Sequence, residues 1–106
     1  MCHCIDCQRR TGGPFGQQAR FPRKHVKIEG SSRRYQRIAD SGNWIAFHFC
    51  PECAATVYYE MEMDPDNYGI PVGAFADPGF PAPRVSVYEG RMHHWVIPPE
   101  NIEHID

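Results

Sequence analysis

Residues 44–61 read WIAFHFCPECAATVYYEM, in which two runs of β-forming residues surround a pair of cysteines. The first run, residues 44–49, alternates so that Ile45, Phe47 and Phe49 share one face of a strand. The second run, residues 56–61, is rich in residues that favour strands. The segment between them is Cys50-Pro51-Glu52-Cys53. This pattern predicts two strands joined by a turn that can hold a metal ion, similar to a zinc-ribbon hairpin.

The five cysteines of the chain fall into two groups, and Cys50-Pro51-Glu52-Cys53 is the second of them. The first is Cys2-His3-Cys4-Ile5-Asp6-Cys7. Thiolates this close in sequence can converge on one ion, and Zn²⁺ takes four tetrahedral ligands with a preference for sulfur and nitrogen. Cys50 and Cys53 would supply half of a structural zinc site. Cys2, Cys4 and Cys7 would leave one position open, as in zinc sites that carry out chemistry.

Other roles for these cysteines explain the pattern less well. A buried cysteine is often only a small apolar residue, but that reading does not account for two clusters. An odd number of cysteines cannot pair completely in disulfides. No secretory signal precedes Cys2, so we expect a cytoplasmic protein with reduced thiols. A redox Cys-x-x-Cys pair usually opens a helix, whereas Cys53 leads into an expected strand. Metal binding is favoured, with zinc as the first choice.

Length and composition set broad limits on the function. A chain of 106 residues has room for one domain, whose modest core a bound metal would help to hold. The net charge of -2 argues against nucleic-acid binding by bulk electrostatics. No apolar run is long enough to span a membrane. Ten prolines and nine glycines predict many turns and short strands rather than long helices.

Four more strands are expected outside the hairpin, at residues 17–21, 25–29, 33–38 and 84–88. Residues 68–74 suggest a further short strand that Pro71 interrupts. Residues 9–14 suggest a turn-rich exit from the first cysteine group, and residues 98–101 a short helical turn. The fold class expected from this pattern is mostly β.

Three stretches resemble signatures of a known family. Cys2-His3-Cys4-Ile5-Asp6-Cys7 with the following Gln8-Arg9-Arg10-Thr11-Gly12-Gly13 is similar to the first signature of the glutathione-dependent formaldehyde-activating family, also called the centromere-protein-V domain. His48-Phe49-Cys50-Pro51-Glu52-Cys53 resembles its second signature, with Ala54 in place of the usual glycine. Residues 72–78 and 83–95 resemble its later segments. The resemblance covers nearly the whole chain.

The resemblance implies an Mss4-like fold of short antiparallel strands with two zinc sites. By position, Cys2, Cys4 and Cys7 would hold a catalytic zinc, and Cys50 and Cys53 would hold half of a structural one. The family's other two structural ligands form a Cys-x-Cys pair upstream of the first signature. We therefore expect residues 1–106 to be a single zinc domain that lacks an N-terminal strand and this pair. The alternative is that the short form is real and that Cys50 and Cys53 find other partners. A ligand at position 2 is also expected to have little that orders it.

The family further implies a carbon–sulfur lyase that joins formaldehyde to glutathione and forms S-hydroxymethylglutathione. Its partner would be a small-molecule thiol such as glutathione, with no nucleic acid and no membrane, and the residues of a glutathione pocket are not apparent. The alternative is a non-catalytic zinc module that binds a thiol or a protein, because one fold can host many functions. The third cysteine of the first group favours the enzyme, since half of a structural site needs only two.

Several other side chains could serve the site or only the fold. Arg9 or Arg10 could offset the negative charge of three thiolates on Zn²⁺. His3 should point away from the metal, either behind the ligands or into solvent. His93 and His94 are expected at a solvated strand end, and Trp95 is expected in the core. His48 shares a face with Trp44 and is expected to pack there, and residues 11–12 and 77–78 suggest turns.

Overall fold

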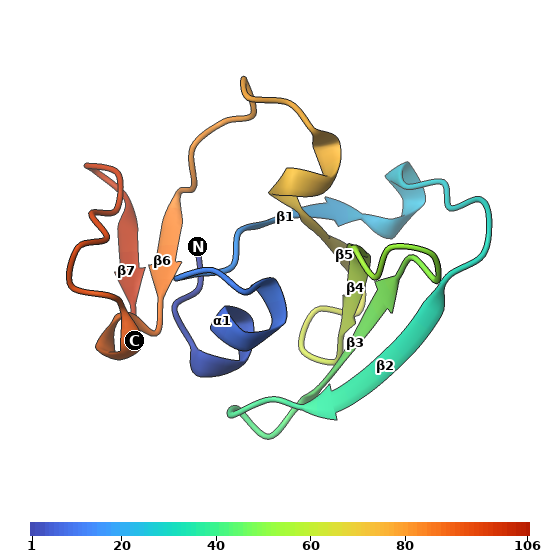
Figure 1. Cartoon of the computed structure of the whole chain (residues 1–106), viewed down its shortest axis with the longest axis horizontal. Coiled ribbons are helices and arrows are strands. Elements are labelled where there is room, and N and C mark those ends of the chain that lie inside the picture. Colours follow the sequence, from blue (N-terminus) through green and yellow to red (C-terminus); the bar gives the residue numbers. More distant parts are fainter. The chain divides into compact units, whose positions relative to one another are not determined.

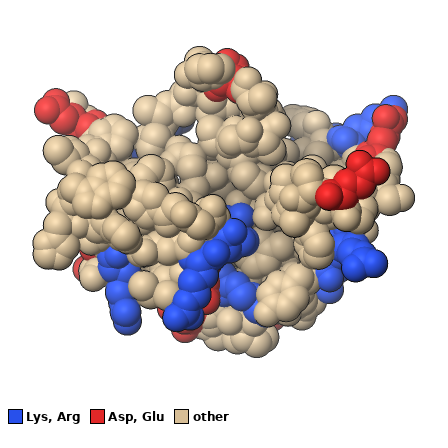
Figure 2. All heavy atoms as spheres, viewed as in Figure 1, with Lys and Arg blue, Asp and Glu red and all other residues tan.

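The computed structural model describes residues 1–106 and contains two compact units (Figure 1). One unit consists of residues 18–76, and the other of residues 1–17 together with residues 77–106. The chain is mostly β with little helix, as expected from the sequence. None of its helices is long and apolar enough to cross a membrane. Figure 2 shows both Lys and Arg side chains and Asp and Glu side chains on the face in view.

The unit of residues 18–76 is built on one antiparallel sheet with the strand order β1-β5-β4-β3-β2. Its strands are β1 (Gln18–Pro22), β2 (Arg33–Ile38), β3 (Trp44–Phe49), β4 (Thr56–Met61) and β5 (Asn67–Pro71). Two short 3₁₀ helices follow β1 and β5, namely η1 (Arg23–His25) and η2 (Val72–Phe75). The expected hairpin of β3 and β4 is confirmed, and Cys50 and Cys53 lie in its turn.

The apolar core of this unit lies on one face of the hairpin. Phe47 in β3 and Tyr59 in β4 are register partners whose rings meet edge to face at 5.1 Å, and both are buried. Gly69 in β5 lies opposite Tyr59, and a Cβ atom at Gly69 would approach Tyr59 Cδ2 to 2.7 Å. Strands normally disfavour glycine, but here the ring of Tyr59 needs the space.

The opposite face of the sheet carries an ion-pair cluster around Glu60. The carboxylate of Glu60 accepts hydrogen bonds from Arg23 Nη2 at 3.1 Å and from His48 Nε2 at 2.7 Å. His48 also stacks on its register partner Tyr58 at 4.1 Å, so its contacts are with β4 rather than with Trp44. Burial alone would raise the pKa of Glu60, but the hydrogen bonds from His48 and Arg23 outweigh it and hold that pKa below its usual value.

The second unit contains a helix and a parallel pair of strands. Its elements are α1 (Ile5–Thr11), β6 (Val85–Val87), η3 (Glu89–Arg91) and β7 (Glu103–Ile105). The N-terminal segment lies beside β6, because the His3 amide donates to the Val87 carbonyl at 3.0 Å and the Val87 amide donates to the Met1 carbonyl at 3.0 Å. Figure 1 shows β6 between β7 and the N-terminus.

Three expectations about secondary structure were wrong. Residues 25–29 form no strand, because η1 occupies Arg23–His25 and irregular chain follows. Residues 98–101 form no helical turn, and the strand β7 after them was not expected. Helix α1 was also missed, since residues 9–11 belong to it rather than to a turn. Two signals for α1 were nevertheless present, a side chain at Cys4 that can cap the helix and a glycine at position 12.

Candidate metal centre

The backbone of Cys2 is held on both sides by hydrogen bonds. Its amide donates to the Gly16 carbonyl at 2.8 Å, and its carbonyl accepts from the Gly16 amide at 2.8 Å. Cys2 also forms a parallel bridge with Val87 of β6. The expectation that little orders a ligand at position 2 was therefore wrong, because the segment before α1 pairs with two other parts of its unit.

Helix α1 places Cys7 close to Cys4. Cys4 is the N-cap residue, and its sulfur accepts a hydrogen bond from the Cys7 amide at 3.3 Å. At the other end, Gly12 adopts the left-handed conformation with φ of 71° and donates its amide to the Gln8 carbonyl. The helix is only two turns long, so capping at both ends contributes much of what holds it in place.

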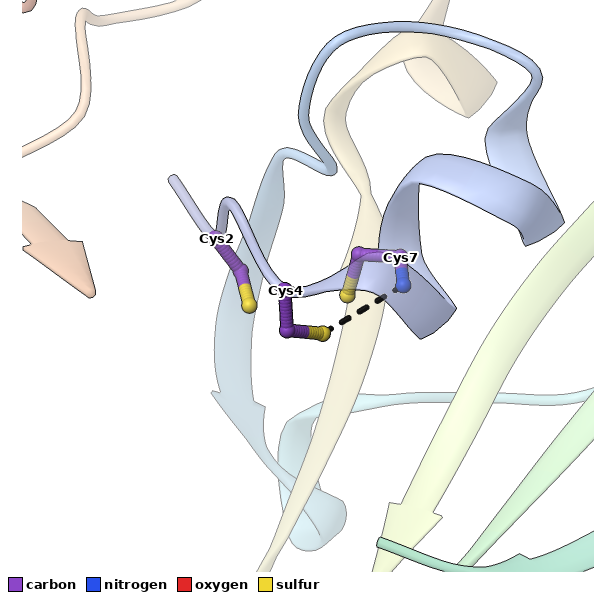
Figure 3. Close-up of side chains that lie close together, drawn as sticks. All are labelled: Cys2, Cys4 and Cys7. Atoms are coloured by element: carbon purple, nitrogen blue, oxygen red, sulfur yellow. Dashed lines mark hydrogen bonds between the residues drawn. The ribbon is translucent and has the colours of Figure 1, made fainter. Parts of the chain in front are cut away.

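The structure brings the three cysteines of the first group together. The sulfur atoms of Cys2, Cys4 and Cys7 all lie within 4.8 Å of one another, and Figure 3 shows them facing a common space. Around a tetrahedral zinc ion, sulfur atoms would lie about 3.8 Å apart, because each Zn–S bond is about 2.3 Å long. The spacing and the soft donor set therefore fit zinc after a small closure of the side chains.

The pKa shifts of Cys2, Cys4 and Cys7 are also consistent with a site that binds a cation. A hydrogen bond from the Cys7 thiol lowers the pKa of Cys2 and, in return, raises the pKa of Cys7. Burial raises the pKa of Cys4. Without a metal, Cys2 is thus the most readily ionised of the three thiols, and desolvation opposes ionisation of Cys4 and Cys7. A divalent cation would stabilise the thiolates and displace the protons.

Gly16 and Arg10 shape the surroundings of Cys7. A Cβ atom at Gly16 would lie 3.3 Å from Cys7 Cβ and 3.5 Å from Cys7 Sγ. The charge of Arg10 lowers the pKa of Cys7, although the hydrogen bond to Cys2 and burial raise it by more. Of the two arginines considered from the sequence, Arg10 is therefore the one close to the triad, whereas Arg9 is exposed. Gly16 was not predicted, because a required glycine is recognisable only from what packs against it.

His3 and Gln8 anchor the triad loop, which is the segment of residues 2–7 that carries the three cysteines. His3 is fully buried, and its Nε2 lies 2.9 Å from Ser86 Oγ in β6, so an exposed position for His3 is excluded. The Gln8 amide nitrogen donates to the carbonyls of His3 and Arg91, each at 2.9 Å. The Gln8 carbonyl oxygen accepts from His93 Nε2 at 2.8 Å. His3 therefore connects residues 2–7 to β6, and Gln8 connects them to the segment that follows β6.

The neighbouring residues of the later segment differ partly from expectation. His93 and His94 are exposed, as expected, but they lie outside any strand. Trp95 is 70% exposed, so its expected place in the core was wrong. Its ring meets the ring of His93 edge to face at 6.0 Å. The turn expected at Asp77 is present, with Asp77 accepting from the Gly79 amide. Thr11 is instead the last residue of α1, and its hydroxyl donates to the Cys7 carbonyl within the helix.

Cys50 and Cys53 lie in the other unit, in the turn between β3 and β4. Backbone amides of Cys53 and Glu52 direct hydrogen bonds at the Cys50 sulfur and lower the pKa of Cys50. Such amides would also suit a metal-bound thiolate at Cys50. Ala54 has a φ of 65° and donates its amide to the Cys50 carbonyl at 2.9 Å. A structural zinc at this pair remains a prediction.

Comparison with known families gives one match. The model of the family described as glutathione-dependent formaldehyde-activating enzyme matches residues 1–91 of the chain. The match includes all five cysteines and ends before β7. No individual curated protein matches the chain.

Proposed function

The chain belongs to the glutathione-dependent formaldehyde-activating enzyme family, and from that premise we propose a zinc-dependent enzyme of the carbon–sulfur lyase type. It would form or cleave the adduct between glutathione and an aldehyde, which for formaldehyde is S-hydroxymethylglutathione. The observation that carries the proposal is the convergence of three cysteine sulfurs within 4.8 Å of one another.

The proposed reaction joins a thiol to a carbonyl. The glutathione sulfur gives an electron pair to the aldehyde carbon and forms the carbon–sulfur bond, while the carbonyl π pair moves to oxygen. The proton that leaves the thiol ends on that oxygen, so no external oxidant or reductant is needed. Zinc held by Cys2, Cys4 and Cys7 would supply a Lewis acid with one position left for a substrate atom.

The residues around the triad support this role by holding the ligands. Cys2 is held by Gly16, Cys4 caps α1, and Cys7 is fixed in the first turn of that helix. Arg10 reduces the negative charge that three thiolates would place around the ion. Thiolate ligands and a thiol substrate both suit a reducing compartment, so we place the reaction in the cytoplasm. We assign Cys50 and Cys53 to a structural zinc site.

The test is exchange between glutathione and formaldehyde, followed by NMR against the uncatalysed background. The zinc-loaded protein should accelerate adduct formation and cleavage equally, as a catalyst must. Cys7→Ser should abolish the acceleration, because an oxygen ligand weakens a soft site. Ser31→Ala, an exposed change in the other unit, serves as the control and should leave the rate unchanged.

Cobalt substitution separates binding from turnover. Cobalt bound by thiolates absorbs visible light, and a thiol in the open position should change that spectrum. A spectral change on adding glutathione, together with no rate above background, would show a thiol-binding module rather than an enzyme. A protein that binds neither zinc nor cobalt would overturn the assignment of the triad.

A further inference from the structure

His3 and Ser86 are the two buried polar residues of the chain, and each is 0% exposed. His3 lies between the ligand candidates Cys2 and Cys4, and Ser86 lies at the centre of β6. The two side chains are joined by a contact of 2.9 Å between His3 Nε2 and Ser86 Oγ. Burying a polar pair costs free energy unless its hydrogen bonds are satisfied. The hydrogen-bond partners of Ser86 therefore help to decide how stably His3 and the triad loop are held.

Glu89 interacts with Ser86 and extends the chain of contacts from His3. A hydrogen bond with Ser86, followed by one with His104, holds the pKa of Glu89 below its usual value, so its carboxylate is ionised and only accepts. Ser86 therefore lies between His3 and Glu89 and contacts both side chains. The Nδ1 atom of His3 is buried without a hydrogen-bond partner, so the ring is oriented by its contact with Ser86 and by the ring of Phe15 at 5.9 Å.

The hydrogen bonds then reach the last strand of the chain. His104 Nδ1 lies 2.5 Å from Glu89 Oε1. His104 belongs to β7 and is the register partner of Ser86 in the parallel pair of β6 and β7. The family match ends at residue 91, so His104 comes from a part of the chain that the family model does not include.

We propose that Ser86, Glu89 and His104 are positioning residues that hold the triad loop in its metal-binding geometry through His3. The segment after residue 91 thereby becomes part of the metal centre. A loop that is already ordered loses less conformational freedom when the ion binds, so its affinity is higher. The inference rests on the proposed metal site, and it adds the residues that set the strength of that site.

The experiment uses two variants and two matched controls in the full chain. Ser86→Ala removes the central hydroxyl, and His104→Gln removes the outer imidazole from an exposed position. The controls are His94→Gln, an exposed histidine of the same unit, and Glu103→Gln, the exposed neighbour of His104 in β7. Zinc affinity is measured by competition with a chromophoric chelator, and cobalt spectra are recorded for each protein.

We expect Ser86→Ala to weaken zinc binding about 10- to 100-fold and His104→Gln about 3- to 10-fold, as is usual for residues behind metal ligands. Both controls should bind like the parent. A weaker or shifted cobalt–thiolate absorption band in the two variants would show that the ligand geometry has changed. Equal affinity and equal spectra in variants and controls, even with a lower melting temperature, would overturn the proposal.

Hydrogen exchange of the metal-free protein keeps the test independent of the proposed function. The His3 amide, which donates to Val87, should exchange faster in Ser86→Ala and His104→Gln than in the controls. If the parent binds no metal, the proposed function fails, and this measurement still decides whether the network holds the loop. Unchanged exchange in His104→Gln, whose substitution is at the surface, would exclude a positioning role for β7.

Discussion

Gly16 contacts Cys7 closely enough that a Cβ atom at Gly16 would lie 3.3 Å from Cys7 Cβ and 3.5 Å from Cys7 Sγ. The backbone of Gly16 is fixed at the same time by its paired hydrogen bonds with Cys2. One glycine therefore contacts two of the three ligand candidates. A side chain there could be accommodated only if Cys7 or the segment around Cys2 moved.

We predict that Gly16→Ala weakens metal binding by the triad about tenfold, comparable to the loss of a group that orients a ligand. The methyl group would crowd Cys7 Cβ, so the side chain of Cys7 would have to shift. The measurement is chelator competition with zinc. Gly13→Ala is the matched control, because a Cβ atom at Gly13 meets nothing closer than 3.7 Å. Equal affinity in both variants would show that Cys7 has room to move.

The left-handed backbone at Ala54 predicts a stabilising substitution. Ala54 has a φ of 65°, which costs about 1 kcal/mol for a residue with a Cβ atom and nothing for glycine. Ala54→Gly should therefore raise the free energy of unfolding by up to about 1 kcal/mol. Chemical denaturation measures this change in the free energy of unfolding. Ala55→Gly, next along the chain and without positive φ, should lower stability instead. If both variants are destabilised, the turn relaxes without the left-handed conformation.

The two cysteine groups should differ in their effect on stability. If Cys50 and Cys53 hold a structural zinc, removing a ligand forfeits part of a binding energy of order 10 kcal/mol. We predict that Cys50→Ser lowers the melting temperature more than Cys7→Ser does. Thermal melting of the zinc-loaded proteins, with and without a chelator, checks this. Two variants that melt like the parent would show that the turn between β3 and β4 holds no metal.

Glu60 should make stability depend on pH at the acid end. Hydrogen bonds from His48 and Arg23 lower its pKa in the folded state below the ordinary value of 4.5. A lowered carboxyl pKa stabilises the fold above 4.5, and this contribution is lost as the pH falls through the folded-state pKa. We therefore predict a steeper loss of stability below pH 4.5 in the parent than in Glu60→Gln.

Urea denaturation at a series of pH values measures this dependence. The control is Glu52→Gln, an exposed change in the turn between β3 and β4. It should leave the acid dependence as steep as in the parent. A parallel pH profile for the parent and Glu60→Gln would show that the ion pairs around Glu60 do not distinguish the folded from the unfolded state.

Local patterns were enough to predict the hairpin and the mostly β fold. The strands β2, β3 and β4 were expected with the bounds that they have, because alternating β-forming residues and turn signals act over short distances. Among the elements that were missed, β7 depends on a partner far along the chain, whereas α1 is closed by local hydrogen bonds and carried local signals. β7 is short and exposed, and it pairs with β6, which lies about fifteen residues earlier in the chain. Its sequence alone carries little strand signal.

The sequence by itself determined the composition of the candidate metal site, since Cys2, Cys4 and Cys7 lie within six residues and cannot be far apart. Only the tertiary structure decided how that site is held. Val85 and Val87 are the apolar residues of β6, yet Ser86 between them is the fully buried one. A serine becomes buried when distant groups satisfy its hydroxyl, and here those groups are His3, at the other end of the chain, and Glu89. Such pairing depends on which segments meet in space, and neither periodicity nor spacing records it.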